Sequence, residues 1–165
     1  MILSTQKSEK TWCEVEAVEK IYCGYETMRC ETKDNLQSQI QNLKSQISNL
    51  KSQISNPDYI MTGINGDPEN DNIYFENCAK LFPNVPLLQY KNIFGESYTA
   101  PALGVYAAAM CLQRGEIPDF LQCDLRLSEM RYETRDKSQI SNPKSKILCY
   151  NHFEDKNHTF ILLSK

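Results

Sequence analysis

Residues 86–118 read PLLQYKNIFGESYTAPALGVYAAAMCLQRGEIP, and this stretch decides the fold expected for the chain. A short apolar run over 86–90 predicts a strand that leads into a polar loop. Residues 99–113 are rich in alanine and other small or apolar side chains, which predicts a helix. Gly115 and Pro118 then end it, as glycine and proline do after a last helical turn. Because this helix is apolar on nearly every side, we expect it to be buried on all faces.

Strand-like and helical runs alternate through the rest of the chain. The first strand is expected to carry a bulge near 18–20, and the next helix is expected to be capped by Asp67 or Asn70. Further strands are predicted over 12–25, 58–66, 146–153 and 158–165, and a further helix over 67–82. This order predicts a single layered α/β domain with a mixed sheet over residues 1–165.

A seven-residue repeat interrupts this plan between Asn35 and Ser55. Its leucines and isoleucines recur at spacings of 4 and 3, the a and d pattern of a coiled coil. Heptads this few, and rich in serine and asparagine, make a marginal helix in water. We therefore expect one amphipathic helix lying on the body of the protein, and a parallel two-stranded coiled coil is the alternative.

The heptapeptide KSQISNP occurs at 51–57 and again at 137–143. Two identical copies so far apart do not form a structural array, which would keep a fixed period. We interpret them as a repeated insert at places where the fold tolerates extra chain, which is typical of surface connections. The sequence therefore predicts a repeat-derived helical insertion over 35–57 and a second repeat-derived loop over 136–146, both outside the core.

The overall composition is that of a globular protein. Its 18 basic and 21 acidic residues give a net charge of −3, which provides no basic footprint for nucleic acid. The apolar helix at 99–113 is too short to span a membrane. The 7 cysteines form no CxxC pair and no cluster with the 2 histidines, which argues against a disulfide framework or a metal site. Since the N-terminus does not look like a signal region, we expect a reducing cytoplasm.

Three motifs stand in order along the chain: DYIMTGINGDPEND at 58–71, KNIFGE at 91–96, and Asn151 with Phe153 before the final strand. Together they resemble the C-terminal half of a β-ketoacyl synthase, the condensing enzyme with the thiolase fold. The first is similar to the family's D-Y-I-N-A-H-G-T-G-T-P-x-N-D, and the second to its K-S-x-x-G-H. The third is similar to the closing N-x-F-G-F-G-G hairpin, without its glycines. The resemblance covers most of the chain outside the repeats.

This resemblance implies the C-terminal half of a thiolase-like fold, and it implies where site residues lie. The two catalytic histidines of the family fall on Gly63 and Glu96. The other site-like positions are Asn70, Asp71, Lys91, Gly95, Asn151 and Phe153. The family's nucleophilic cysteine belongs to the N-terminal half, and no cysteine here stands in a matching turn. The histidines that the chain does have, His152 and His158, are expected as polar positions around a surface hairpin.

These substitutions predict a site without condensing chemistry, cofactor or metal. An ionised Glu96 accepts hydrogen bonds but donates none, so it cannot stabilise a developing enolate as a neutral imidazole can. We expect Glu96 to be buried in a structural ion pair with Lys91, and the alternative is a general base with a raised pKa.

The leading hypothesis is a catalytically degenerate ketosynthase-like protein of fatty acid or polyketide-type biosynthesis, either a fragment or a partner resembling a chain-length factor. Its expected partners are a ketosynthase N-terminal half or an intact ketosynthase, with acyl carrier protein as a further candidate. One alternative is an active acyltransferase subunit that completes a condensing site with another chain. A second is an interaction module built on the heptad stripe. The thiolase-like fold that the resemblance implies is built from two halves, and one half alone exposes apolar surface. We therefore expect the isolated chain to form oligomers or to aggregate.

Overall fold

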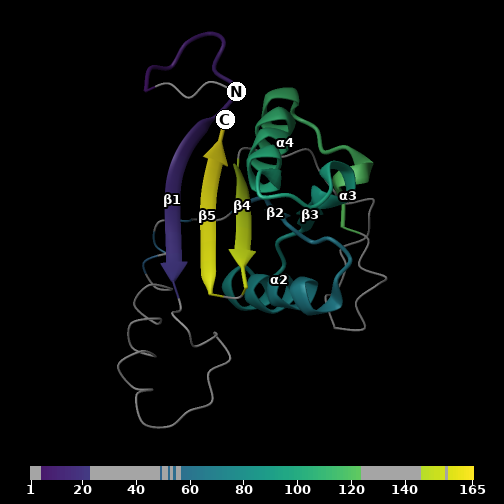
Figure 1. Ribbon diagram of the computed structural model, residues 1–165. Coiled ribbons are helices and arrows are strands. Elements are labelled where there is room, and N and C mark those ends of the chain that lie inside the picture. The colour runs from purple at the N-terminus through teal and green to yellow at the C-terminus, as the bar shows by residue number, and fades with distance from the viewer. Residues whose placement is uncertain are drawn as a thin grey trace.

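The computed structural model describes residues 5–22, 57–123, 146–154 and 156–165, and the single positions 49, 52 and 54. Five strands form one sheet in the order β1-β5-β4-β2-β3 (Figure 1). They are β1 (Glu14–Tyr22), β2 (Tyr59–Thr62), β3 (Leu87–Gln89), β4 (Lys146–Phe153) and β5 (Asn157–Ser164). The helices are α2 (Pro68–Leu81), α3 (Lys91–Phe94), α4 (Ala100–Arg114) and the 3-10 helix η1 (Asp119–Leu121).

The sheet is mixed, as predicted. Strand β2 runs parallel to both of its neighbours, β3 and β4, whereas β5 is antiparallel to β4 and β1. The carboxyl ends of β2, β3 and β4 therefore lie along one edge. The chain runs from β2 through α2 to β3, and then returns through α4 to β4 on the other side of β2 (Figure 1). In open α/β sheets, such a reversal marks the edge where ligands bind.

The strands alternate their side chains between two apolar layers. One layer joins Ile60, Leu148 and Phe160 to Tyr74, Cys78 and Leu81 of α2. The other joins Met61, Ile147 and Cys149 to Ala108, Cys111 and Leu112 of α4. Helices thus cover both faces of the sheet, which confirms the layered α/β plan. Among the described helices, none is both long and apolar enough to cross a bilayer.

Helix α4 is buried on one side only, so the prediction that all of its faces are buried is wrong. Gly104 lies so close to the Tyr90 ring that an added Cβ would be 2.6 Å from it. On the outer side, Leu103 and Tyr106 are each 37% exposed, since small residues bring only one side of the helix onto the sheet. The helix ends as predicted, with Gly115 in the left-handed conformation.

Strand β1 has its bulge at another place than predicted, and most of the strand is exposed. Its bulge lies between Val15 and Ala17, not near 18–20. Of its residues, Ile21 is buried, whereas Val15 and Val18 are 49% and 60% exposed. The reason is that β1 is an edge strand, and its apolar residues on the α4 side lie beyond the reach of that helix.

The repeat segment reaches the core at its end, which corrects the prediction that 35–57 lies wholly outside it. Ile54 is 2% exposed and packs in the α2-side layer, whereas Asn49 and Ser52 are exposed. This pattern fits an amphipathic stripe lying on the body at that point. The other stripe positions lie outside the described residues, as does 136–145, but Lys146 belongs to β4 and not to a loop.

Candidate functional site

The loop after β2 is held in shape by Asp71 of α2. The Asp71 carboxylate, 8% exposed, accepts hydrogen bonds from the backbone N–H groups of Asn65 (3.0 Å) and Gly66 (2.9 Å). Asp67 caps α2 by accepting from the N–H of Glu69 at 3.1 Å, so the Asp67 alternative for the cap is confirmed. Gly66 has φ +91°, a conformation that favours glycine.

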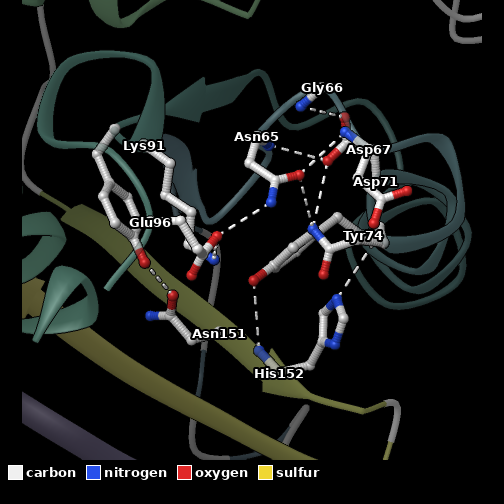
Figure 2. A network of polar contacts seen from close by, with 11 residues as sticks. Asn65, Gly66, Asp67, Asp71, Tyr74, Lys91, Glu96, Asn151 and His152 are labelled. Atoms are coloured by element: carbon white, nitrogen blue, oxygen red, sulfur yellow. Dashed lines mark hydrogen bonds and ion pairs between the residues drawn. The ribbon is translucent and has the colours of Figure 1, made fainter. Parts of the chain in front are cut away.

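Lys91 and Glu96 form the predicted ion pair on the loop after β3. Lys91 Nζ lies 2.7 Å from Glu96 Oε2, and Asn65 Nδ2 donates to the same oxygen at 3.0 Å (Figure 2). Gly95, with φ 71°, turns the chain after α3 so that Glu96 comes back over Lys91. The two side chains differ in exposure: that of Lys91 is 10% exposed and that of Glu96 is 59% exposed. The expectation that Glu96 is buried is therefore wrong.

Glu96 does not have the raised pKa that a general base would need. Its partial burial acts to raise the pKa, but the hydrogen bonds from Lys91 and Asn65, with the Lys91 charge, outweigh it. The net effect holds the pKa of Glu96 below its usual range. At neutral pH this group is a carboxylate, which accepts hydrogen bonds and donates none.

Gly63, the first of the two histidine positions, has no room for a side chain. A Cβ added there would lie 2.4 Å from the Tyr74 hydroxyl and 3.1 Å from Lys91 Cε. Tyr74 comes from α2 and is 1% exposed. Gly63 and Glu96 therefore both border Lys91, although they belong to separate motifs.

The end of β4 brings a third group of residues to this edge. The Tyr90 hydroxyl donates to Asn151 Oδ1, and His152 Nε2 lies 3.3 Å from the carbonyl oxygen of Asn70. The His152 ring packs on the Tyr74 ring at 4.4 Å between centroids. Figure 2 shows these contacts as part of one polar network across the three strand ends.

The two histidines lie opposite each other on the β4–β5 hairpin, as predicted, but they are not at the surface, which corrects that part of the prediction. His158 is fully buried, and its Nδ1 lies 3.0 Å from the Tyr150 hydroxyl. His152 is half-buried, and its Nδ1 lies inside the fold with no hydrogen-bond partner among the described residues. The physical reason is that aromatic rings lie against both histidines: Tyr74 packs on the His152 ring and Tyr150 stacks on the His158 ring.

The structure brings most of the predicted positions together. Gly63, Asn70, Asp71, Lys91, Gly95, Glu96 and Asn151 all lie at the carboxyl edge of β2, β3 and β4. Phe153 belongs to β4 as well, but it is 58% exposed. The described residues contain no group of acidic, histidine and cysteine side chains that could hold a metal ion.

Tyr74 is the residue of this site that the sequence reasoning missed. Tyr74 lies on the buried stripe of α2 with Cys78 and Leu81. The spacing of four and three along 74, 78 and 81 is the helical signal that would have found it.

Comparisons with known proteins give no further guide to this site. No family model, curated protein or solved structure matches the chain.

The Lys91–Glu96 pair is expected to contribute little to stability. We expect Glu96→Gln to lower the free energy of unfolding by less than about 1 kcal/mol, because water screens a carboxylate that is largely exposed. Urea denaturation of both proteins at low and high salt measures this, and the difference should shrink as salt rises. A loss of several kcal/mol, independent of salt, would contradict the exposed geometry.

Proposed function

We propose that this chain is a β-ketoacyl synthase-like protein without condensing activity of its own, which acts together with an active synthase. It is either the C-terminal portion of a split synthase or a partner that resembles a chain-length factor. The partners that this proposal names are a ketosynthase N-terminal half or an intact ketosynthase, with acyl carrier protein as a further candidate.

One observation carries the proposal: the two positions that match the family's histidines both border Lys91. Lys91 Nζ contacts Glu96 at 2.7 Å, and Lys91 Cε would lie 3.1 Å from a Cβ at Gly63. Two residues that share one reacting group must lie this close together. This shared neighbour supports the proposal, while the residues at both positions differ from those of the family.

The side chains present support a lack of condensing chemistry. An enolate needs hydrogen-bond donors at the oxygen where negative charge develops. The Glu96 carboxylate accepts only, and it adds negative charge there. Lys91 could supply a positive charge, but the ion pair already uses it.

The described cysteines also lack the features of a nucleophile. Burial raises the pKa of Cys78 and Cys149 far above the usual range for a thiol, and it raises the pKa of Cys111 to about 11. A catalytic thiol needs a lowered pKa, because the thiolate is the form that attacks. These three described cysteines are therefore unsuited to attack, and the proposal assigns the nucleophile to the partner.

Co-expression with the neighbouring ketosynthase reading frames tests the proposal. We expect the chain to copurify as a stable complex with one of them and to show no condensation of malonyl-carrier substrates alone. If none copurifies, the partner role is wrong. If the wild-type complex needs this chain for a condensing site, the alternative of an active acyltransferase subunit is correct instead.

Histidine substituted at Gly63 and at Glu96 tests how much space surrounds each position. We expect Glu96→His to fold like the wild type, because the position is exposed. Gly63→His is expected to fold poorly, and to cost less stability when added to Tyr74→Ala than when added to the wild type, because Tyr74 fills the space. Circular dichroism and urea denaturation of the variants check this. Equal tolerance of both single changes would contradict the close contact at Gly63.

A further inference from the structure

A cavity of about 660 Å³ lies at the edge of the sheet opposite the candidate site. Its walls come from residues 7–14, from Gln113 near the end of α4 and from Lys165 after β5. The pairing of Glu14 with Ser164 brings the first and last described segments together at this edge. Small-molecule sites in proteins have volumes of about 300 to 1,000 Å³. This space, which we call the N-terminal cavity, is therefore large enough for a small organic ligand.

The N-terminal wall of this cavity is held in place by its own contacts. The Thr11 N–H donates to the Ser8 carbonyl oxygen at 3.0 Å, and the Ser8 N–H donates to Thr11 Oγ1 at 2.8 Å. Lys7 forms an ion pair with Glu14 across this turn. The turn therefore gives the wall its shape without any ligand.

Trp12 supplies the apolar surface of the cavity. This side chain packs against the apolar layer under α4, and its ring lies 5.9 Å from the Tyr106 ring between centroids. Trp12 is only half-buried, however, and it also lines the cavity. An indole that is fixed on one side and open on the other can pack on the ring of a ligand.

The charges that line the cavity favour an anion. Three lysines and two glutamates lie along its walls. Lys7 and Glu14 neutralise each other, and Lys165 Nζ donates to an uncharged group, a backbone carbonyl oxygen of α4, at 3.4 Å. Neither Lys10 nor Glu9 has an ion-pair partner in the part of the chain that the structure describes. Two ammonium groups and one carboxylate leave a positive potential, which attracts an anion.

We propose that the N-terminal cavity binds a small aromatic carboxylate. Lys10 and Lys165 contact the carboxylate of the ligand, and Trp12 packs on its ring. Because both lysines are exposed, each contact contributes little, and we expect a dissociation constant in the millimolar range. The cavity shares no residue with the site around Lys91, so binding here does not depend on the ketosynthase proposal.

Titration of the full chain with benzoate tests the site. Calorimetry measures the affinity, and the fluorescence of Trp12 reports the location, because the chain has 1 tryptophan. We expect both signals to saturate with the same dissociation constant. Acetate has the charge without the ring, and protonated benzylamine has the ring with the opposite charge. Both should bind at least about threefold more weakly than benzoate, since each lacks one of the two kinds of contact.

Substitutions at the cavity should change the affinity for benzoate in opposite directions. Lys10→Gln and Lys165→Gln are each expected to raise the dissociation constant about threefold, the effect of one exposed ion pair. Glu9→Gln should lower it, because it removes the carboxylate that repels the ligand. Lys20→Gln is the matched control, since Lys20 is an exposed lysine on β1 outside the cavity, and it should leave the dissociation constant unchanged.

Three results would overturn the proposal. The first is the absence of saturable binding of benzoate, or binding that leaves the fluorescence of Trp12 unchanged. The second is protonated benzylamine binding as tightly as benzoate, which would show that the cavity does not select an anion. The third is equal dissociation constants for Lys10→Gln, Lys165→Gln and Lys20→Gln when circular dichroism shows all three to be folded.

Discussion

Replacement of Gly63 by alanine is expected to destabilise the fold by about 1 to 3 kcal/mol, the usual cost of overpacking a filled site. The new Cβ would lie 2.4 Å from the Tyr74 hydroxyl. Tyr74 cannot swing away, because its ring packs at 5.1 Å from the Tyr150 ring and at 4.4 Å from the His152 ring. Gly63 does not have a positive φ, so the cost is steric and not conformational.

Urea denaturation measures the stability lost on Gly63→Ala, once in the wild type and once in the Tyr74→Phe variant. In Tyr74→Phe the hydroxyl is gone, and the nearest ring atom would lie 3.2 Å from the new Cβ, so the loss should be smaller. Gly66→Ala is the matched control. It meets nothing within 4 Å and is strained only by φ +91°, so its cost should be the same in both backgrounds. An equal loss for Gly63→Ala in both would show that Tyr74 does not set the limit.

Lowering the pH from 7 to 5 is expected to cost the fold about 1 to 2 kcal/mol through His152, allowing for the part of the ring that water reaches. Burial is the main cause that lowers the pKa of His152 to about 4, and the charges of His158 and Lys91 act in the same direction, against the hydrogen bond to Asn70. An unfolded histidine titrates near 6.5, so the unfolded state takes up the proton first. Stability is therefore complete above pH 6.5 and is lost as the pH falls toward 4.

Comparison with His152→Gln isolates this effect. Glutamine can still donate to the Asn70 carbonyl oxygen but does not titrate. Urea midpoints at pH 7 and pH 5, at equal protein concentration, give the loss for each protein. The carboxylates are common to both proteins, so their contribution cancels in the difference. The wild type should lose more stability than the variant, and equal losses would contradict the buried, neutral His152.

Local patterns in the sequence were sufficient for most elements of the fold, but not for α3, which lies in the predicted polar loop. The alanine-rich run and Gly115 predicted α4 and its end, and Asp67 was one of two predicted caps of α2. What the sequence did not show was how far each element is covered. Leu103 and Val18 look like core residues by type, but burial depends on which element lies opposite, and this is a tertiary property.

The motifs indicated candidate site residues but not their contacts. Gly63, Lys91 and Glu96 were among these residues, and the fold brings them to one edge because parallel strands have their carboxyl ends together. The roles of Tyr74 and His152 could not be read in the same way. Both act through packing across the sheet edge, between residues more than seventy positions apart in the sequence.

The burial of Ile54 makes the repeat tolerant of changes in whole heptads but not of other changes in length. KSQISN occurs at 44–49 as well as at 51–56, so the loss of seven residues brings Ile47 to the place of Ile54. A loss that is not a multiple of seven would bring a residue from another heptad position into the layer under α2, where Ile54 is 2% exposed. Replacement of a buried aliphatic side chain by a smaller one costs about 2 to 5 kcal/mol. The fold therefore selects the unit in which this segment can grow or shrink.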